Sequence, residues 1–267
     1  MKLKELLDEL RHYGEGYVNE ERTCDTLKCG DIEADIKKVA VTMMPNADTI
    51  RRAAEWGADL MICHEPLYYV HMDKTEGREE DPVIRMKKEL VAQSGMAIFR
   101  LHDHMHHNKP DDMIFKGEIL ALDLPGKQEP SPYYAVSHYT LDEPITPRAL
   151  AKRLEERLDI RHIRIVGAAD KPMTKLGCCF GAAGNLQNEL SLGREIILTG
   201  EADEWSDAEY IRDAAAFGSN AALLIMGHVG SERDGMFYLA RLLTERYVSE
   251  LNVRYFDCGE VYTYTDI

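Results

Sequence analysis

Two segments in opposite halves of the chain share one order of features: a helical stretch, an aromatic residue, a glycine, an apolar run and a histidine. The first covers residues 51–64 and ends in His64, and the second covers residues 212–228 and ends in His228. In the first half another short apolar run, 39–43, precedes the helix. A strand, a helix and a further strand in this order predict a parallel βαβ unit, because parallel neighbours need a crossover connection. Each half is therefore expected to contain α/β structure in which a histidine follows the carboxyl end of a strand. Open α/β sheets place their binding sites at these strand ends.

Hydrophobic periodicity and helix-end signals predict the remaining elements. Helices are expected at residues 3–13, 49–56, 82–94, 111–122, 146–158 and 235–250, and strands at 39–43, 59–63, 96–101, 133–141, 163–166, 176–180 and 253–256. The stretch up to Gly30 that follows the first helix is polar and irregular. Prolines and a glycine cluster between Pro125 and Pro132, which predicts a boundary between residues 1–130 and 131–267. Gly177, Gly181 and Gly184 lack the spacing of a nucleotide-binding loop and indicate a tight turn.

Composition excludes several classes of protein. The formal net charge of the 267 residues is −15, which disfavours a nucleic-acid processing factor, since binding to a phosphate backbone rests on lysine and arginine. No apolar run approaches the roughly 18 residues that a membrane helix needs. The first ten residues carry acids where a signal peptide has an apolar centre, so we expect a cytoplasmic protein without membrane contact. The six cysteines have no zinc-finger spacing and are expected to be reduced.

The segment 100–108 holds four of the ten histidines: His102, His104, His106 and His107. Imidazole is the commonest metal ligand in proteins, and the segment follows an apolar run read as a buried strand. Alternation along an extended backbone is expected to send His102, His104 and His106 to one side and Asp103 to the other. By itself the segment is also compatible with a polar surface loop or an adventitious metal-binding tract.

Three separated loops offer ligands of one chemical kind. They contain His64 and Glu65, then His102 to His107, then His228 and Glu232. Imidazole and carboxylate without thiolate suit Zn²⁺, Mn²⁺, Fe²⁺, Co²⁺ or Ni²⁺. These candidates exceed what one tetrahedral ion needs, whereas two ions about 3.5 Å apart would use them all.

Each of these residues also has a simpler explanation when taken alone. His64 fits a core histidine, Glu65 a helix N-cap before Pro66, and Glu232 an acid in the first turn of a helix, where the dipole favours it. Glu201 is either a further residue that reaches the site or a solvated loop acid. Their joint occurrence at strand ends favours the metal site.

The chain resembles the Nif-three-like dinuclear-metal family, whose members are described as type 2 GTP cyclohydrolase I homologues. The resemblance covers nearly the whole chain and is carried by residues 37–41, 57–67, 197–201, 227–232 and 253–257. The family's late His-x-x-x-Glu is intact as His228 and Glu232. The early histidine pair is His64 followed by Glu65, and the middle His-x-x-x-Asp is His102 followed by His106. A third departure is Glu204-Trp205, where relatives often carry histidine.

The resemblance implies a Nif-three-like fold: two similar α/β lobes with mixed, largely parallel sheets and no inserted domain. It also implies a toroidal homohexamer whose metal sites face an inner cavity. The exchange of a histidine for Glu65 and of an aspartate for His106 conserves the formal ligand charge. We therefore expect a variant dinuclear site with two divalent ions per chain.

The leading functional hypothesis is a metal-dependent hydrolase. His64, Glu65, His102, His106, His228 and Glu232 would hold the ions, and Glu201 or Asp103 would accept a proton from water. The family description suggests a small phosphorylated or nucleotide-like substrate. The alternative is a non-catalytic metal-binding or metal-handling hexameric scaffold, which the additional histidines His104 and His107 favour.

Overall fold

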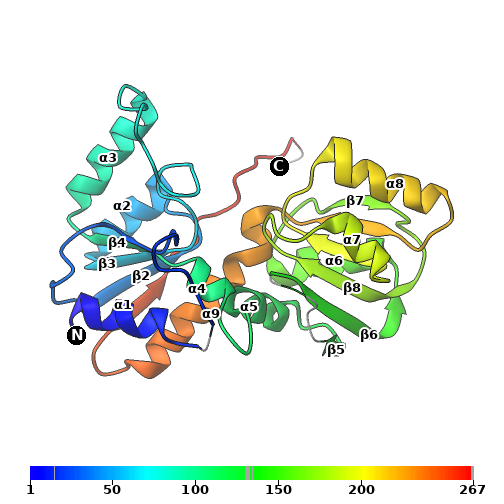
Figure 1. The fold of residues 1–267 in the computed structure, drawn as a ribbon, viewed down its shortest axis with the longest axis horizontal. Coiled ribbons are helices and arrows are strands. Elements are labelled where there is room, and N and C mark those ends of the chain that lie inside the picture. Colours follow the sequence, from blue (N-terminus) through cyan, green and yellow to red (C-terminus); the bar gives the residue numbers. More distant parts are fainter. Residues whose placement is uncertain (15, 130–132, 134, 266–267) are drawn as a thin grey trace. The chain divides into compact units, whose positions relative to one another are not determined.

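The computed structural model describes residues 1–14, 16–129, 133 and 135–265 (Figure 1). The chain divides into two compact units. The first consists of Met1–Gly117 and Gly235–Gly259, and the second of Glu118–Asp234 and Glu260–Ile267. The boundary expected at residues 130 and 131 lies outside the described residues. The C-terminal segment Gly235–Gly259 belongs to the first unit, which the expected division into residues 1–130 and 131–267 does not include.

The first unit contains a five-stranded sheet with the order β1-β4-β3-β2-β11. Its strands are β1 (Leu27–Cys29), β2 (Lys38–Thr42), β3 (Leu60–Cys63), β4 (Ala97–Arg100) and β11 (Asn252–Tyr255). Strands β4, β3, β2 and β11 are parallel, and β1 pairs antiparallel with β4. The parallel strands expected from the apolar runs and the C-terminal edge strand are confirmed.

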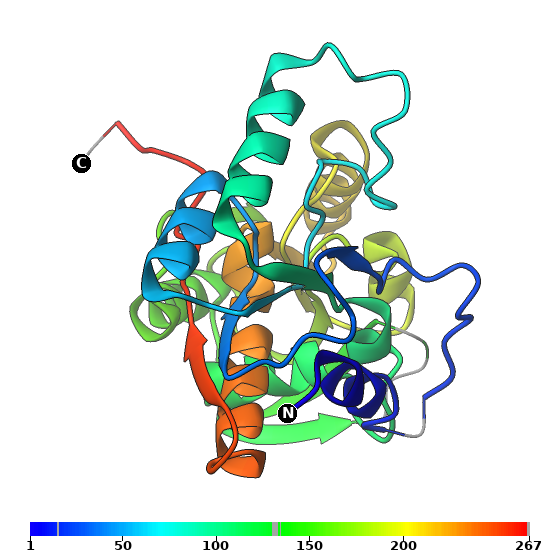
Figure 2. The ribbon, with the colours of Figure 1, turned by 90° about the vertical axis from the view of Figure 1, so that its left-hand side faces the viewer.

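Helices cover both faces of this sheet (Figures 1 and 2). Helices α2 (Ala47–Trp56) and α3 (Pro82–Ser94) lie on one face, and α1 (Leu3–Arg11) lies on the other. Helix α2 begins where the Asn46 side chain accepts a hydrogen bond from the Thr49 amide and ends at Gly57 in the left-handed region. The buried core under α2 and α3 comprises Ala40, Ile50, Ala53, Ala58, Met61, Cys63, Leu67, Val91, Met96, Ile98 and Phe256.

The second unit contains a six-stranded sheet with the order β5-β6-β8-β9-β10-β7. Its strands are β5 (Gly126–Glu129), β6 (Ser137–Ile145), β7 (Arg164–Gly167), β8 (Met173–Cys179), β9 (Ile196–Thr199) and β10 (Ala222–Ile225). The central strands β8, β9 and β10 are parallel, and the flanking pairs are antiparallel. The expected α/β fold with mixed sheets is therefore present in both units.

The helices of the second unit also pack on its sheet. Helix α7 (Leu186–Ser191) contributes Leu186 and helix α8 (Glu209–Ala216) contributes Ile211 to a buried cluster with Ile197 and Leu223 of the sheet. Helix α6 (Pro147–Leu158) packs against β10 and β7. As predicted, α6 opens with a proline, and the Thr146 hydroxyl accepts a hydrogen bond from Ala149.

Two helices belong to both units. Helix α5 (Met113–Leu122) and helix α9 (His228–Arg246) cross the unit boundaries. The last helix was expected to begin at Gly235, but α9 begins at His228. Gly235 lies inside this helix, and a Cβ at this position would stand 2.5 Å from Cα of Ile114. Close packing, and not a helix start, thus explains this glycine.

Some short elements are absent from the sequence predictions. The polar, irregular segment contains β1, and the cluster taken as a boundary contains β5, whose residues are mostly exposed. Neither strand shows the apolar alternation that identifies a half-buried strand. None of the helices among the described residues combines the length and apolar character that crossing a bilayer requires.

Candidate metal centre

Two adjacent parallel strands position the first histidines in the first unit. Strand β3 ends at Cys63 and is followed by His64, and its neighbour β4 ends at Arg100 and is followed by Leu101 and His102. The Leu101 amide still donates to the Cys63 carbonyl at 2.9 Å. Because the carboxyl ends of parallel strands meet at one edge, the two histidines are brought together. Their rings stack with centroids 4.5 Å apart.

The histidine-rich segment is helical and not extended. After His102 the chain forms one turn, α4 (Asp103–His106), with the His106 amide 3.1 Å from the His102 carbonyl oxygen. The expected alternation is therefore wrong, because a helix places residues i and i+4 on one face. The turn brings the His102 and His106 rings to 4.8 Å between centroids. His104 points elsewhere.

The Nδ1 atom of each clustered histidine is anchored. His64 Nδ1 lies 3.1 Å from the Leu101 carbonyl oxygen, and His102 Nδ1 lies 2.9 Å from Oδ1 of Asp103. Both acceptors require a proton on Nδ1. In neutral rings this leaves the Nε2 lone pairs available as ligands, the arrangement that metal-binding histidines usually have.

His106 completes the cluster. Its Nδ1 lies 2.9 Å from Oδ2 of Asp112, and its Nε2 lies 3.2 Å from Nε2 of His64. His64, His102 and His106 each offer a ring nitrogen within 4.8 Å of the other two. Nitrogens that face one another at these distances repel unless a proton or a cation lies between them. The donor set therefore fits a divalent transition metal or zinc.

Electrostatics favours the metal-binding form of His64. The side chain is fully buried. Burial, then the neighbouring His102 and His106 and the Arg100 guanidinium, hold the pKa of His64 well below its ordinary value. A neutral imidazole is the form that binds metal.

The Asp25 carboxylate holds the histidine-rich turn in place through hydrogen bonds. This carboxylate is fully buried and accepts hydrogen bonds from the amides of His102, Asp103 and His104 at 2.7 to 3.0 Å. It also lies 2.7 Å from Nδ1 of His104, whose Nε2 lies 2.8 Å from Glu20. His104, which the sequence suggested as an additional metal-handling residue, instead links the turn to two carboxylates.

Asp103 is held by three partners. Its carboxylate contacts His102 Nδ1 and accepts from the Thr23 hydroxyl at 2.7 Å and the Cys24 amide at 3.1 Å. Burial acts to raise the pKa of Asp103, but the hydrogen bonds from His102 and Thr23 outweigh it, so the pKa is lowered. The Cys24 thiol lies 3.6 Å from Asp103 Oδ1. Burial raises the pKa of this thiol, which keeps it protonated.

Glu65 lies beside a buried cation. The Arg100 side chain is completely buried, and one of its terminal nitrogens lies 3.5 Å from Oε2 of Glu65. Its Nε donates to the His64 carbonyl at 2.8 Å, and a further nitrogen donates to the His71 carbonyl. Arg100 thereby connects the two residues that follow β3.

The second unit repeats the arrangement at its own parallel strands. Strand β9 is followed by Glu201 and its neighbour β10 by His228, whose Nδ1 lies 2.7 Å from Oε1 of Glu201. Because α9 starts at His228, Glu232 lies one turn further on, with Oε2 3.2 Å from His228 Nε2. Glu201 thus contacts His228, which is one of the two alternatives that the sequence leaves open for this residue.

A glycine turn makes room for Glu232. Gly181 has φ +62°, and a Cβ there would stand 2.3 Å from Oε1 of Glu232. The Gly181 amide donates to the Ser231 hydroxyl at 2.9 Å. The tight turn predicted at this glycine therefore leaves room for the Glu232 carboxylate.

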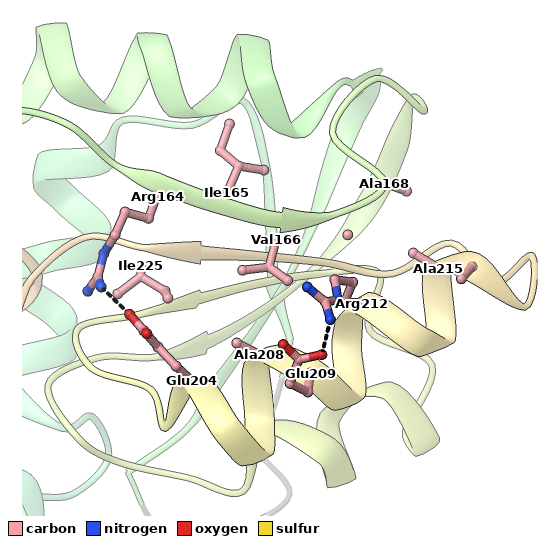
Figure 3. A pocket seen from close by; sticks show the side chains of 12 residues that line it. Arg164, Ile165, Val166, Ala168, Glu204, Ala208, Glu209, Arg212, Ala215 and Ile225 are labelled. Carbon is pink, nitrogen blue, oxygen red and sulfur yellow. Dashed lines mark hydrogen bonds and ion pairs between the residues drawn. The ribbon is translucent and has the colours of Figure 1, made fainter.

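A surface pocket of about 670 Å³ in the same unit lies between β7, β10 and α8 (Figure 3). Arg164 pairs with Glu204 and Arg212 pairs with Glu209 on its walls. None of the predicted metal ligands is among its lining residues. Glu204 lines this pocket, and the adjacent Trp205 is 81% exposed.

Three residues that support the histidine cluster were not predicted from the sequence: Asp25, Asp112 and Arg100. Asp25 is a lone acid in an irregular segment and Asp112 is one of two adjacent acids. Arg100 is the last residue of an apolar strand, with no sign in the sequence that its charge is buried. The ring of His71 lies 5.5 Å from that of His102. The pair of acids Asp111 and Asp112, shortly after the histidine-rich segment, is a sequence signal that could have indicated Asp112.

Comparisons with known proteins agree with these features. Residues 1–259 match the family model described as Duf34/NIF3 (NGG1p interacting factor 3). A GTP cyclohydrolase 1 type 2 homolog of Clostridium perfringens is 20% identical over 259 residues, which is 94% of each chain. Among solved structures, protein ybgI, described as of unknown function, has a TM-score of 0.77 at 20% identity, covering 97% of this chain and 99% of that one. A Bacillus cereus protein related to NIF3 has a TM-score of 0.74 at 13% identity, covering 97% of each.

Proposed function

Because this chain belongs to the Duf34/NIF3 family, we propose that it is a metal-dependent hydrolase that uses its histidine cluster to bind divalent ions and activate water. The observation that carries the proposal is the convergence of three imidazoles whose Nδ1 atoms are all anchored. A core histidine needs only satisfied hydrogen bonds, whereas three mutually facing nitrogens are arranged for a cation.

The proposed metal ligands come from both units. In the first unit they are His64, His102 and His106, with Glu65 beside them, and in the second unit they are His228 and Glu232. The family resemblance supports two divalent ions of Zn, Mn, Fe, Co or Ni for these ligands. When bound, divalent ions would supply Lewis acidity that makes hydroxide available near neutral pH and stabilises developing negative charge.

The two candidate proton acceptors differ in their surroundings. Asp103 is fixed by Thr23, Cys24 and His102, so it orients the His102 ring. The Glu201 side chain is 60% exposed and holds Nδ1 of His228 through one oxygen. We therefore assign the proton-accepting role to Glu201 and the positioning role to Asp103.

The substrate class rests on the relatives. Proteins described as GTP cyclohydrolase 1 type 2 homologs match most of the chain, which supports a small phosphorylated or nucleotide-like substrate. The same resemblance supports a toroidal homohexamer in the cytoplasm.

A second candidate function is metal handling without turnover. His64 is fully buried and His106 is 6% exposed, and buried ligands are typical of closed sites that store or sequester an ion. A catalytic site must instead keep one coordination position open to water and substrate.

Metal content and hydrolysis measured on one sample test the proposal. Metal content by elemental analysis and oligomer mass would be determined for the wild type, His228→Ala and His12→Ala. His12→Ala is the control, because it removes an exposed histidine whose ring contacts the Asp8 carbonyl oxygen at the end of α1. We expect about two ions per chain in the wild type and the control, and fewer in His228→Ala.

Hydrolysis of a chromogenic phosphodiester distinguishes the two candidate functions. Cleavage that is lost with a chelator and restored by metal would support the hydrolase. Full metal loading without cleavage of phosphodiesters, phosphomonoesters or nucleotides would support metal handling.

A further inference from the structure

Two adjoining cavities lie in the first unit, where α9 packs near the end of α1 and the start of α5. Their volumes are about 280 and 340 Å³, and Tyr13, Met113 and Arg246 line both. The described residues that line them all belong to the first unit, and none is a proposed metal ligand. We propose that the two cavities form one binding site for a small amphipathic anion, in which a phosphate or carboxylate is carried on an apolar chain. This site is additional to the proposed hydrolase and does not depend on it.

The larger, polar cavity has an excess of positive charge. Lys109, Lys116 and Arg246 line it, and Asp111 is the one acid among its described lining residues. Lys116 pairs with Asp111 at 2.9 Å, whereas Lys109 forms no ion pair with any residue that the structure describes. The whole chain has a formal net charge of −15, so this wall is a local reversal of sign. A concave surface of one charge attracts a small ion of the opposite charge.

The loop that carries Lys109 is held by contacts of its own. A Cβ at Gly14 would stand 1.5 Å from Oδ1 of Asn108, so glycine lets the segment after α1 approach this loop closely. Nδ2 of Asn108 donates to the Asp111 carbonyl oxygen at 3.0 Å. A wall that is already ordered lowers the entropy cost of binding a ligand.

Two phenol hydroxyls complete the polar cavity. Tyr13 and Tyr238 line it, and a phenol hydroxyl can donate a hydrogen bond to an anion. The hydrogen bond to Asp111 raises the pKa of Lys116, and Tyr238 and Tyr13 act in the same direction. Lys116 therefore stays cationic at neutral pH beside these donors.

The smaller, apolar cavity suits the other end of the ligand. Buried apolar side chains form much of its wall: Leu10, Met113, Leu239, Leu243 and Tyr247. Its acids are Glu9, which pairs with Arg246 at 2.8 Å, and Glu245. Because like charges repel, an anionic group is disfavoured here. The charges thus orient the ligand, with its head near Lys109 and Lys116 and its chain along the leucines.

A ligand that fills both cavities fits them better than an inorganic ion. An inorganic anion would occupy the polar cavity alone and leave the leucine surface in contact with water, which is unfavourable. Small-molecule sites in proteins typically enclose about 300–1,000 Å³, with apolar walls and a few converging polar groups. Each cavity is close to the lower limit, and the two together match this description.

Calorimetric titration with octyl phosphate tests the site. A chelator in all solutions removes divalent ions, so binding at a metal centre does not contribute. We expect a Kd below about 1 mM for octyl phosphate, and affinities at least about tenfold lower for inorganic phosphate, which lacks the chain, and for 1-octanol, which lacks the charge. Octanoate, titrated in the same way, identifies the preferred head group, and binding of either amphiphile supports the site.

Three variants and a matched control locate the bound molecule. Lys109→Met and Lys116→Met keep a long side chain and remove its charge, and Leu242→Asn makes the wall of the apolar cavity polar. Each is expected to weaken the binding of octyl phosphate at least about fivefold. Lys4→Met removes an exposed lysine of α1 that lines neither cavity, and it should keep the wild-type Kd.

Equal affinities of the wild type, both lysine variants and Leu242→Asn would overturn the proposed site. Equal affinities for octyl phosphate and 1-octanol, or no binding of either amphiphile at millimolar concentration, would do the same. Because no divalent ion is present in these titrations, such results would leave the proposed metal-dependent hydrolysis standing.

Discussion

Oδ2 of Asp112 lies 2.9 Å from Nδ1 of His106, while Oδ1 of the same carboxylate accepts the Phe115 amide at 3.0 Å. One acid therefore orients a candidate metal ligand and satisfies an amide in the first turn of α5. Helix position and ring orientation are coupled through this side chain. The role is that of a positioning residue, since Asp112 contacts the imidazole and not the proposed ion.

Replacing Asp112 by alanine is expected to weaken metal binding without removing a ligand. The His106 ring would lose the acceptor that fixes its tautomer, and such losses typically lower metal affinity about 10- to 100-fold. Competition with a chelating dye measures the effect. The matched control is Asp111→Ala, which removes the neighbouring, more exposed carboxylate paired with Lys116. Equal affinities of the two variants would show that Asp112 does not orient His106.

Asp25 is expected to control the stability of the histidine-rich turn. In Asp25→Asn the buried side chain keeps its shape, but its amide group faces backbone amides that need an acceptor. Removing a buried charge from such a network costs on the order of 3 kcal/mol in the free energy of unfolding. Chemical denaturation of the metal-free protein measures this loss.

The control for this measurement is Asp31→Asn, an exposed acid whose Oδ1 accepts the Glu33 amide. It should change the free energy of unfolding by less than about 0.5 kcal/mol. A loss of the same small size in Asp25→Asn would mean that the three amide contacts contribute little to the turn.

The strands and the residues at their ends were the predictable part of this molecule. Apolar runs identified β2, β3 and β4, and the parallel order placed His64 and His102 at one edge. Hydrophobic residues that recur with the period of a strand or of a helix indicate which face of the element is buried. The helical period identified α2 and α3. Short strands such as β1 and β5 have no such pattern, because β1 has only three residues, all half-buried, and β5 is mostly exposed.

The conformation of the histidine-rich segment could not be predicted from its own residues. A turn of four residues is too short to be stable as an isolated helix. Here it is held by Asp25, which is 77 residues away from His102 in the sequence. Long-range contacts of this kind leave no local signal. They also decided that His106, and not His104, joins His64.

A buried lysine gives the first unit a pH dependence that is independent of the metal site. Lys87 in α3 is 6% exposed, and its ammonium lies 4.5 Å from the centre of the Tyr69 ring. Burial lowers the pKa of Lys87 from 10.5 to about 8. The unfolded chain, with an ordinary lysine pKa, therefore binds this proton more tightly than the folded chain does. It follows that protonation favours unfolding, and stability should rise as the pH increases from about 8 towards 10.5.

Lys87→Met is expected to abolish that rise and to stabilise the protein at pH 7. A shift of this size corresponds to about 3 kcal/mol, from which the lost contact with the Tyr69 ring subtracts about 0.5–1 kcal/mol. The measurement is the free energy of unfolding between pH 7 and pH 10, taken as the difference between wild type and variant so that other titrating groups cancel. Lys88→Met, on the exposed side of the same helix, is the control and should keep the wild-type slope. A slope that is unchanged in Lys87→Met would show that Lys87 remains charged and solvated in the folded protein.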